Sequence, residues 1–183
     1  MSEKGALLEV LLAEYNCLKS EQAQRIGFRD NLLYVTLGVF GAVVSFAVSA
    51  PGNYYALLVI PWVCVILGWT YIVNDEKISS IGRYIRYELA AKVKACTGND
   101  ASETLLGWEV AHRDDKHRKR RKIQQLVVDE ITFVFSGLIA LGAFWFMVAN
   151  PPLGVTFLSW IELLLLLALG VEIFIYADFG RGL

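Results

Sequence analysis

The sequence is poor in the residue types on which most catalytic and metal sites depend. It has two histidines and three cysteines among 183 residues, and they do not fall into the paired spacing of a zinc site. It also has no Walker loop, no nucleophile elbow and no histidine and carboxylate pair at a catalytic spacing. We therefore expect a protein that is not an enzyme and that binds no metal ion or other cofactor.

Lysine and arginine are absent from four long apolar stretches, at residues 31–50, 54–73, 131–149 and 154–177. Hydrophobic residues make up 56% of the sequence, whereas about 45–50% is usual in a soluble domain. Each stretch has about the 20 residues that a helix needs to cross the hydrocarbon of a bilayer. We expect an all-α fold, a four-helix transmembrane bundle of two helical hairpins with helical cytoplasmic extensions.

The basic residues all fall on one side of these spans. Of the 17 lysines and arginines, four lie before the first span, 12 between the second and third, and one after the fourth. The positive-inside rule places these three segments in the cytoplasm. The predicted organisation is a cytoplasmic N-terminal helix (1–30), a transmembrane hairpin (31–73), a cytoplasmic helical segment with a basic run (74–130), a second hairpin (131–177) and a cytoplasmic tail (178–183).

The N-terminal arm and the cysteines exclude two features of secreted proteins. The first 30 residues carry four glutamates where a cleavable signal peptide would need an apolar core, so we expect none. Cys17 and Cys96 are predicted in the cytosol and Cys64 within a span. Cytosolic thiols stay reduced, so we expect no disulfide.

Helical periodicity continues beyond the first two spans. No proline separates the arm from the first span, which predicts one continuous helix from about Gly5. The second span should also continue, as far as a turn at residues 97–100. A third cytoplasmic helix is predicted to start near Ser102 and to reach the third span. Pro61 is expected to kink the second span.

Two glutamates, Glu162 and Glu172, lie within the fourth apolar stretch. A carboxylate in hydrocarbon costs several kcal/mol and by default indicates a function. Both are candidate pore-lining residues, because a ring of Glu162 side chains around an oligomer axis would select cations by charge. Two alternatives stay open. Glu162 could lie at the outer headgroup level beside Trp160, and Glu172 at the cytoplasmic interface.

The densest charge lies in the segment HRDDKHRKRRK, residues 112–122, with seven lysines and arginines. It is open to three interpretations: a membrane-proximal helix that contacts anionic lipid, a site for a nucleotide or single-stranded nucleic acid, or a contact for a protein partner. A nearby tryptophan could stack on a base. The candidate ligand-binding residues are Arg113, Lys116, Arg118, Lys119, Arg120, Arg121, Lys122 and Trp108.

Small residues recur along the first span. Gly41, Ser45 and Ser49 follow one another at intervals of four residues, the pattern that lets membrane helices approach closely. A monomer of this size has few partners for its apolar helical faces. We expect a homo-oligomer, with a tetramer favoured.

Several short motifs are distributed along the chain. They are EYNCLK at Glu14–Lys19 with Arg25 and Arg29 after it, TLG at Thr36–Gly38, PW at Pro61, LGW at Leu67, NDE at Asn74, IG at Ile81 and GWE at Gly107. Together they resemble small four-span bacterial proteins encoded in phage-defence operons. The resemblance implies an oligomeric channel of the bacterial inner membrane, closed until infection is sensed, which then depolarises the host. The basic run is similar in kind to what a DNA-gated effector of the Hailong type would need.

The leading hypothesis is therefore an oligomeric ion channel of bacterial antiphage defence. Its gating agent would be a cytoplasmic anionic ligand, either a nucleotide or single-stranded DNA, or a soluble partner encoded in the same operon. The alternative is a non-conducting membrane adaptor or sensor that recruits a cytosolic defence enzyme. Replacing Glu162 by glutamine should alter conductance in the first case and have no effect in the second. A small transporter would need buried charges on more than one span.

Overall fold

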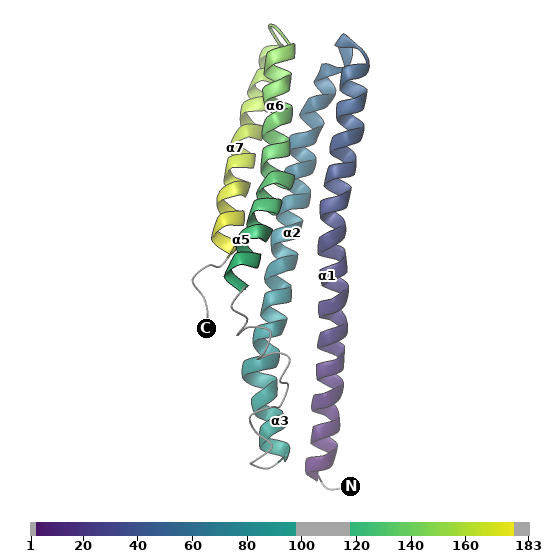
Figure 1. Ribbon diagram of the computed structural model, residues 1–183, viewed down its shortest axis with the longest axis vertical. Helices are drawn as coiled ribbons and strands as arrows, with labels where there is room; N and C mark the ends of the chain where they lie inside the picture. The colour runs from purple at the N-terminus through teal and green to yellow at the C-terminus, as the bar shows by residue number, and fades with distance from the viewer. Residues whose placement is uncertain (1–2, 98–117, 178–183) are drawn as a thin grey trace. The chain divides into compact units, whose positions relative to one another are not determined.

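A computed structural model of the protein describes residues 3–97 and 118–177, and these residues form helices joined by short turns (Figure 1). The fold is all-α, as predicted, and contains four long helical runs. In chain order the elements are α1 (Glu3–Ser49), the 3-10 helix η1 (Pro51–Leu58), α2 (Val59–Tyr84), the π-helix η2 (Ile85–Leu89), α3 (Ala90–Thr97), α5 (Arg118–Asp129), the π-helix η3 (Glu130–Phe135), α6 (Ser136–Met147) and α7 (Leu153–Tyr176).

Each of the four helical runs is long and apolar enough to cross a membrane. They are Lys4–Ser49, Pro51–Thr97, Arg120–Met147 and Leu153–Tyr176, and the most apolar part of each has a mean hydropathy between 1.8 and 2.2. A helix satisfies its own backbone hydrogen bonds, which is what the interior of a bilayer demands. The protein is therefore a multi-pass membrane protein.

The two predicted helical continuations are confirmed. α1 runs without a break from Glu3 to Ser49, so the arm and the first span form one helix of 47 residues. The second run is helical from Pro51 to Thr97, with the π-helix η2 between α2 and α3. The predicted turn after Thr97 and the predicted helix start at Ser102 lie outside the described residues, while α5 falls within the segment predicted for that third helix.

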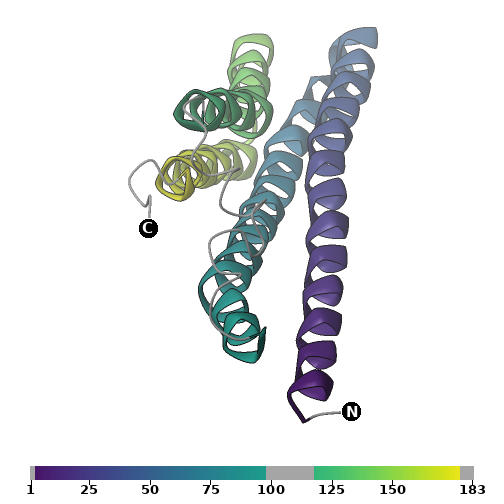
Figure 2. The same ribbon diagram turned by 60° about the horizontal axis from the view of Figure 1, so that its bottom comes forward.

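The described residues divide into two compact units. Unit 1 comprises the part of α1 up to Phe28 and the helical run from Asn74 onward, with η2 and α3. The two stretches lie side by side in Figure 2, in purple and teal. Their core contains Leu11 from α1 and a row one turn apart on the other stretch, Ile85, Leu89 and Val93. This is an amphipathic helical pair, which the periodicity of both segments predicts.

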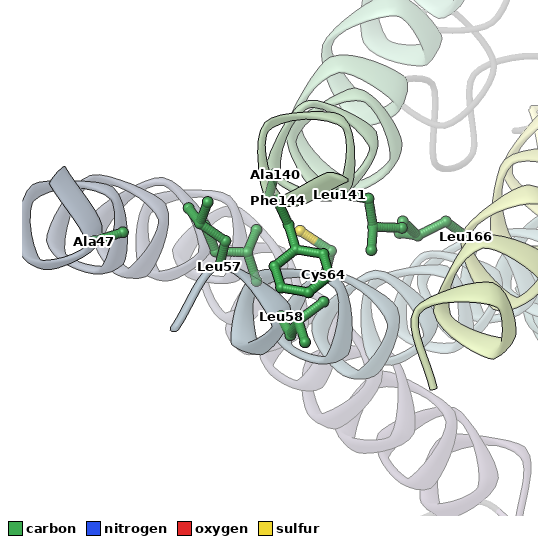
Figure 3. Close-up of a cluster of buried hydrophobic side chains, with 9 residues drawn as sticks. Ala47, Leu57, Leu58, Cys64, Ala140, Leu141, Phe144 and Leu166 are labelled. Carbon is green, nitrogen blue, oxygen red and sulfur yellow. The ribbon is translucent and has the colours of Figure 1, made fainter. Parts of the chain in front are cut away.

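Unit 2 comprises residues 29–73 and the chain from Lys119 onward, and it holds parts of all four predicted spans. One core cluster gathers α1, η1, α2, α6 and α7, and Figure 3 shows Phe144 beside Cys64 with Leu141 directed toward Leu166. A second cluster contains Leu32, Tyr71, Ile72, Phe133, Val134, Leu169 and Ile173. Four spans thus pack around a shared interior within this unit.

Two glycines allow close contact between helices of unit 2. A Cβ atom on Gly68 of α2 would lie 2.7 Å from Cδ2 of Leu169 and 3.1 Å from Cβ of Phe133. A Cβ atom on Gly137 of α6 would lie 2.6 Å from Cδ2 of Leu166. Lipid tails are as apolar as leucine, so helix association in a membrane depends on such tight van der Waals packing.

Pro61, where a kink is predicted, lies just after a change of helical geometry. The helical geometry changes from 3-10 in η1 to α at Val59, so Pro61 lies in the first turn of α2. Amide N–H groups in the first turn of an α-helix have no partner within that helix, so the missing N–H of proline is tolerated there. The sequence could not predict this, because η1 looks like a continuation of the same apolar span.

Each of the two hairpin connections is short and contains an asparagine. In the first, the Asn53 backbone N–H bonds to the Ala50 carbonyl at 3.0 Å, and the Asn53 side-chain amide reaches the Phe46 carbonyl at 3.2 Å. In the second, Asn150 adopts a left-handed conformation with φ of 57°, which asparagine tolerates better than most residues. These contacts end the helices and reverse the chain.

Candidate functional site

The carboxylate of Glu162 is enclosed within unit 2. The residue is 1% exposed and lies on the buried face of α7, whose buried residues are Ser159, Glu162, Leu166, Leu169 and Ile173. Trp160 lies on the exposed side of the same helix, at 54%. Glu162 therefore faces the interior of the helix bundle, and its depth in the membrane stays a prediction.

Neither carboxylate oxygen of Glu162 has a hydrogen-bond partner among the described residues. The Trp62 side chain of α2 interacts with the carboxyl group, but no donor reaches either oxygen with hydrogen-bond geometry. A buried polar group without a partner is expensive and usually has a functional reason. Glu162 is accordingly the strongest functional candidate in the membrane-spanning part of the chain.

The polar groups nearest to Glu162 along α7 are already engaged. The Ser159 hydroxyl donates to the Thr156 carbonyl at 2.8 Å and accepts a hydrogen bond from the Trp145 indole N–H at 3.0 Å. The rings of Trp145 and Trp160 also contact each other, with centroids 5.3 Å apart. These contacts join α6 to α7 and fix the helical turn that precedes Glu162.

Glu172, the second pore-lining candidate, has a different environment. It lies near the carboxyl end of α7 and is half-buried. The two pore-lining candidates therefore differ in exposure, and a half-buried position also suits the interfacial alternative. Whether either lines a pore stays a prediction.

A polar cluster links α1, α2 and α5 in unit 2. Gln125 donates a hydrogen bond from Nε2 to the Tyr71 hydroxyl at 3.0 Å. That hydroxyl also interacts with the Asp129 carboxylate, and the Arg29 guanidinium lies over the Tyr71 ring, 5.9 Å from its centroid. Tyr71 and Asp129 are buried, at 4% and 6% exposed. We call Arg29, Tyr71, Gln125 and Asp129 the polar cluster.

Comparison of the chain with protein-family models, with curated proteins and with solved structures found no match. Function must therefore be argued from the site itself.

The basic run is described only in part. Arg113, Lys116 and Trp108 lie outside the described residues, and Arg118 and Lys119 are described as backbone of α5 only. The side chains of Arg120 and Arg121 are exposed. Lys122 is half-buried, and its ammonium group donates to the Ala177 carbonyl, just beyond α7, at 3.5 Å. Lys122 thus contributes a favourable cation at the negative end of the α7 dipole.

The π-helix η3 joins the basic helix α5 to α6. Its wider turn brings the Ser136 backbone N–H to the Ile131 carbonyl, and the Ser136 hydroxyl donates to the same carbonyl at 3.0 Å. Short π-helical turns within α-helices occur often at functional sites. Here the irregular turn follows Asp129 of the polar cluster directly.

Unit 1 has its own interhelical polar contacts. The Tyr84 hydroxyl donates to the Glu14 carboxylate at 2.6 Å and accepts from the Lys92 ammonium at 3.3 Å. The Asn74 side-chain amide donates to the Arg25 carbonyl at 2.7 Å. These bonds fix the pairing of the two helical stretches.

Sequence reasoning did not identify the polar cluster as a site. In the sequence, Tyr71 is an aromatic residue near the end of the second apolar stretch, and Asp129 lies just before the third. In the structure Asp129 lies inside a helix that continues into η3, and its side chain is buried. The sequence did contain one indication of the cluster. Gln125 and Asp129 are four residues apart, a spacing that places both side chains on one face of a helix.

No cluster of three or more histidine, cysteine, aspartate or glutamate side chains suited to a metal occurs within residues 3–97 and 118–177. The three cysteines are separate from one another, with Cys64 buried and Cys17 exposed. The site is therefore built from single carboxylates and hydrogen bonds.

Proposed function

We propose that the protein is an oligomeric ion channel of bacterial antiphage defence in the inner membrane, opened by an anionic ligand in the cytoplasm. The observation that carries the proposal is Glu162, a buried carboxyl group on a helix long and apolar enough to span a membrane, with no partner for either oxygen among the described residues. An ionisable residue at such a position is typical of ion pathways in membrane proteins. Glu162 is the group that a permeating cation meets.

The proposed gating ligand binds the basic run. Arg120 and Arg121 are exposed cations on α5, and the guanidinium group of arginine can bind a phosphate group through two parallel hydrogen bonds. α5 continues through η3 into α6, which packs on α7 in the same unit as Glu162. A nucleotide or single-stranded oligonucleotide gates the channel if it binds the open state more tightly than the closed one.

Oligomerisation is supported by the free face of α1. Only 17% of the most apolar window of α1 is buried within the chain, compared with 44% for the second and third spans. Gly38 and Gly41 have open space where a side chain would stand. The small-residue stripe therefore lies away from the core of the single chain, where a second α1 could approach it. A tetramer remains the favoured assembly.

Planar-bilayer recording of the purified protein tests the channel. We expect single-channel currents when a single-stranded oligonucleotide is added to the cytoplasmic side. The Glu162→Gln variant should form the same oligomer and carry an altered current. If the protein conducts under none of the nucleotide or oligonucleotide conditions, the channel proposal is wrong.

The ligand site is tested separately by binding to a fluorescent oligonucleotide at increasing salt. An electrostatic phosphate site loses affinity as salt rises. Combined Arg120→Gln and Arg121→Gln substitutions should weaken binding and reduce this salt dependence. Arg83→Gln with Lys94→Gln is the matched control, because it removes two exposed cations outside the run. Equal losses in the two variants would contradict a specific site.

The adaptor alternative is favoured by one feature of unit 1. Near the start of α1, Leu7, Val10 and Leu12 are 51%, 63% and 45% exposed, in a segment predicted to be cytoplasmic. Exposed apolar residues grouped on one helix are typical of protein contacts. In this case Val10→Asp would abolish recruitment of a soluble enzyme, and Glu162→Gln would leave function unchanged.

A further inference from the structure

We propose that Glu162 is a proton-binding site, which takes up and releases a proton inside the helix bundle. The inference deepens the proposed function, on which its biological role rests, because it names the cation that this carboxyl group exchanges. The proton site itself follows from four observations on the membrane-spanning helices.

The first observation is enclosure. Glu162 is 1% exposed, and both of its oxygens are buried. It lies on the same face of α7 as Leu166, one turn further on, which packs against Gly137 and belongs to a core cluster with Cys64 and Phe144. The carboxyl group thus faces the Trp62 side chain and apolar neighbours rather than water.

The second observation is the absence of a counter-charge in the sequence of the spans. Residues 31–73 and 131–177 contain no lysine or arginine, and Glu162 and Glu172 are their only acidic residues. An isolated carboxylate in a low-dielectric interior is far less stable than a neutral carboxylic acid, which has no net charge to solvate. Protonation is the simplest way for this residue to be stable where it lies.

The third observation concerns the titratable groups on the neighbouring helices. On the part of α2 that lies in unit 2, up to Val73, these are Cys64, in the same core cluster as Leu166, and Tyr71, which belongs to the polar cluster. On η3 it is Glu130, whose Oε2 lies against Gly170, two turns beyond Glu162 on α7. α6 contributes none, since its sequence is SGLIALGAFWFM. Residues 59–73 of α2 and residues 130–147 of η3 and α6 contain no lysine, arginine or histidine, so no basic group on them competes with a proton for Glu162.

The fourth observation argues against a metal cation. Divalent cations such as Ca²⁺ require roughly six to eight oxygen ligands. Around Glu162 the Ser159 oxygen is already engaged by Thr156 and Trp145, and no group of three metal-ligating side chains occurs in the described part of the chain. A proton needs only one carboxylate oxygen.

The chemical step is a simple proton transfer. A carboxylate oxygen of Glu162 accepts a proton from a hydronium ion to form an O–H bond and leaves a water molecule, and the reverse step returns the proton to a water molecule to form hydronium. Charge and atoms balance without any further reactant. Each cycle moves one positive charge to or from the interior of the bundle.

Infrared spectroscopy of the full-length protein in liposomes tests the inference. We expect, at neutral pH, a carbonyl stretching band of a protonated carboxyl group that weakens at alkaline pH. The band should be missing in Glu162→Gln and retained in Glu172→Gln, the matched control on the same helix. A hydrophobic carbodiimide should label Glu162 at neutral pH, and labelling should fall about tenfold for each pH unit above the midpoint of titration.

Each outcome supports or overturns the inference. A wild-type spectrum without the band at neutral pH, or a band that survives in Glu162→Gln, would show that Glu162 is not the proton site. Should Glu162→Gln fail to fold, the wild-type labelling profile decides alone, because mass spectrometry locates the labelled residue. Neither measurement depends on conduction. A proton site in a protein that never conducts would therefore count against the channel and leave this inference standing.

Discussion

Gln125 of α5 donates a hydrogen bond to the hydroxyl group of Tyr71 on α2, with 3.0 Å between the two atoms. The same hydroxyl interacts with Asp129, one turn further along α5. Residues 54 positions apart in the sequence are thereby joined at a buried point of unit 2. A single phenol group thus connects the second span to the helix that carries the basic run.

The Tyr71→Phe substitution should destabilise unit 2. It removes the hydroxyl and leaves Gln125 without this acceptor, and an interhelical hydrogen bond in a membrane protein contributes about 1 kcal/mol. Thermal unfolding in detergent measures the loss. Tyr34→Phe is the control, since Tyr34 is 72% exposed on α1, and it should leave the melting temperature unchanged. Equal melting temperatures for Tyr71→Phe and wild type would mean that the polar cluster contributes no stability.

Gly68→Ala should be more damaging than an alanine at most other glycines. The new methyl group would meet Leu169 at 2.7 Å and Phe133 at 3.1 Å, and overpacking of this kind costs about 1–3 kcal/mol. Gly142→Ala is the matched control in α6, because nothing lies within 4 Å of its Cβ position. Alanine is a better helix former than glycine, so this control should be neutral or stabilising. A reversed order of the two unfolding temperatures would refute the packing of α2 against α7.

The predicted topology can be tested with a membrane-impermeant thiol reagent in whole cells. Ala149→Cys, at the exposed connection between α6 and α7, should be labelled in intact cells. The native Cys17, exposed on α1, should react only after the membrane is permeabilised. Labelling of Cys17 in intact cells would reverse the orientation and remove the cytoplasmic ligand site with it.

Gly41→Leu should disrupt association while leaving the fold of the chain intact. The Gly41 position has open space around it within one chain, so a larger side chain creates no clash there. If α1 helices meet through this face, leucine would hold them apart. Native mass spectrometry should detect smaller assemblies and circular dichroism an unchanged helix content. An unaltered oligomer would place the contact on another face.

The fold was predictable because its determinants are long and repetitive. Four apolar stretches free of lysine and arginine specify four spans, and the unbroken periodicity from Gly5 into the first span specifies the length of α1. The irregular helices were not predictable. η1, η2 and η3 depend on how neighbouring helices pack, and the helical pattern of the sequence continues through all three.

For the candidate site, the sequence indicated some of the residues but not their burial or their contacts. The sequence indicated Glu162, because a carboxylate in hydrocarbon costs free energy. It did not show that Glu162 lies on the buried face of α7 with Leu166, whereas Trp160 lies on the exposed face, since this depends on how α7 packs. The sequence did not indicate Asp129, because its burial depends on contact with Tyr71 from a distant span. The positive charge of the basic run is evident from the sequence. The identity of its ligand is not, because it depends on molecules other than this chain.

The π-helix η3 would allow α5 to rotate about its own axis relative to α6. An α-helix advances about 100° per residue. The hydrogen bond from the Ser136 N–H to the Ile131 carbonyl in η3 spans one residue more than an α-helical bond, and the Ser136 hydroxyl donates to the same carbonyl. Expelling that surplus residue would swivel α5 about its own axis by roughly a quarter-turn relative to α6. Arg120 and Arg121 would then face a new direction, and the hydrogen bond between Gln125 and Tyr71 would have to break.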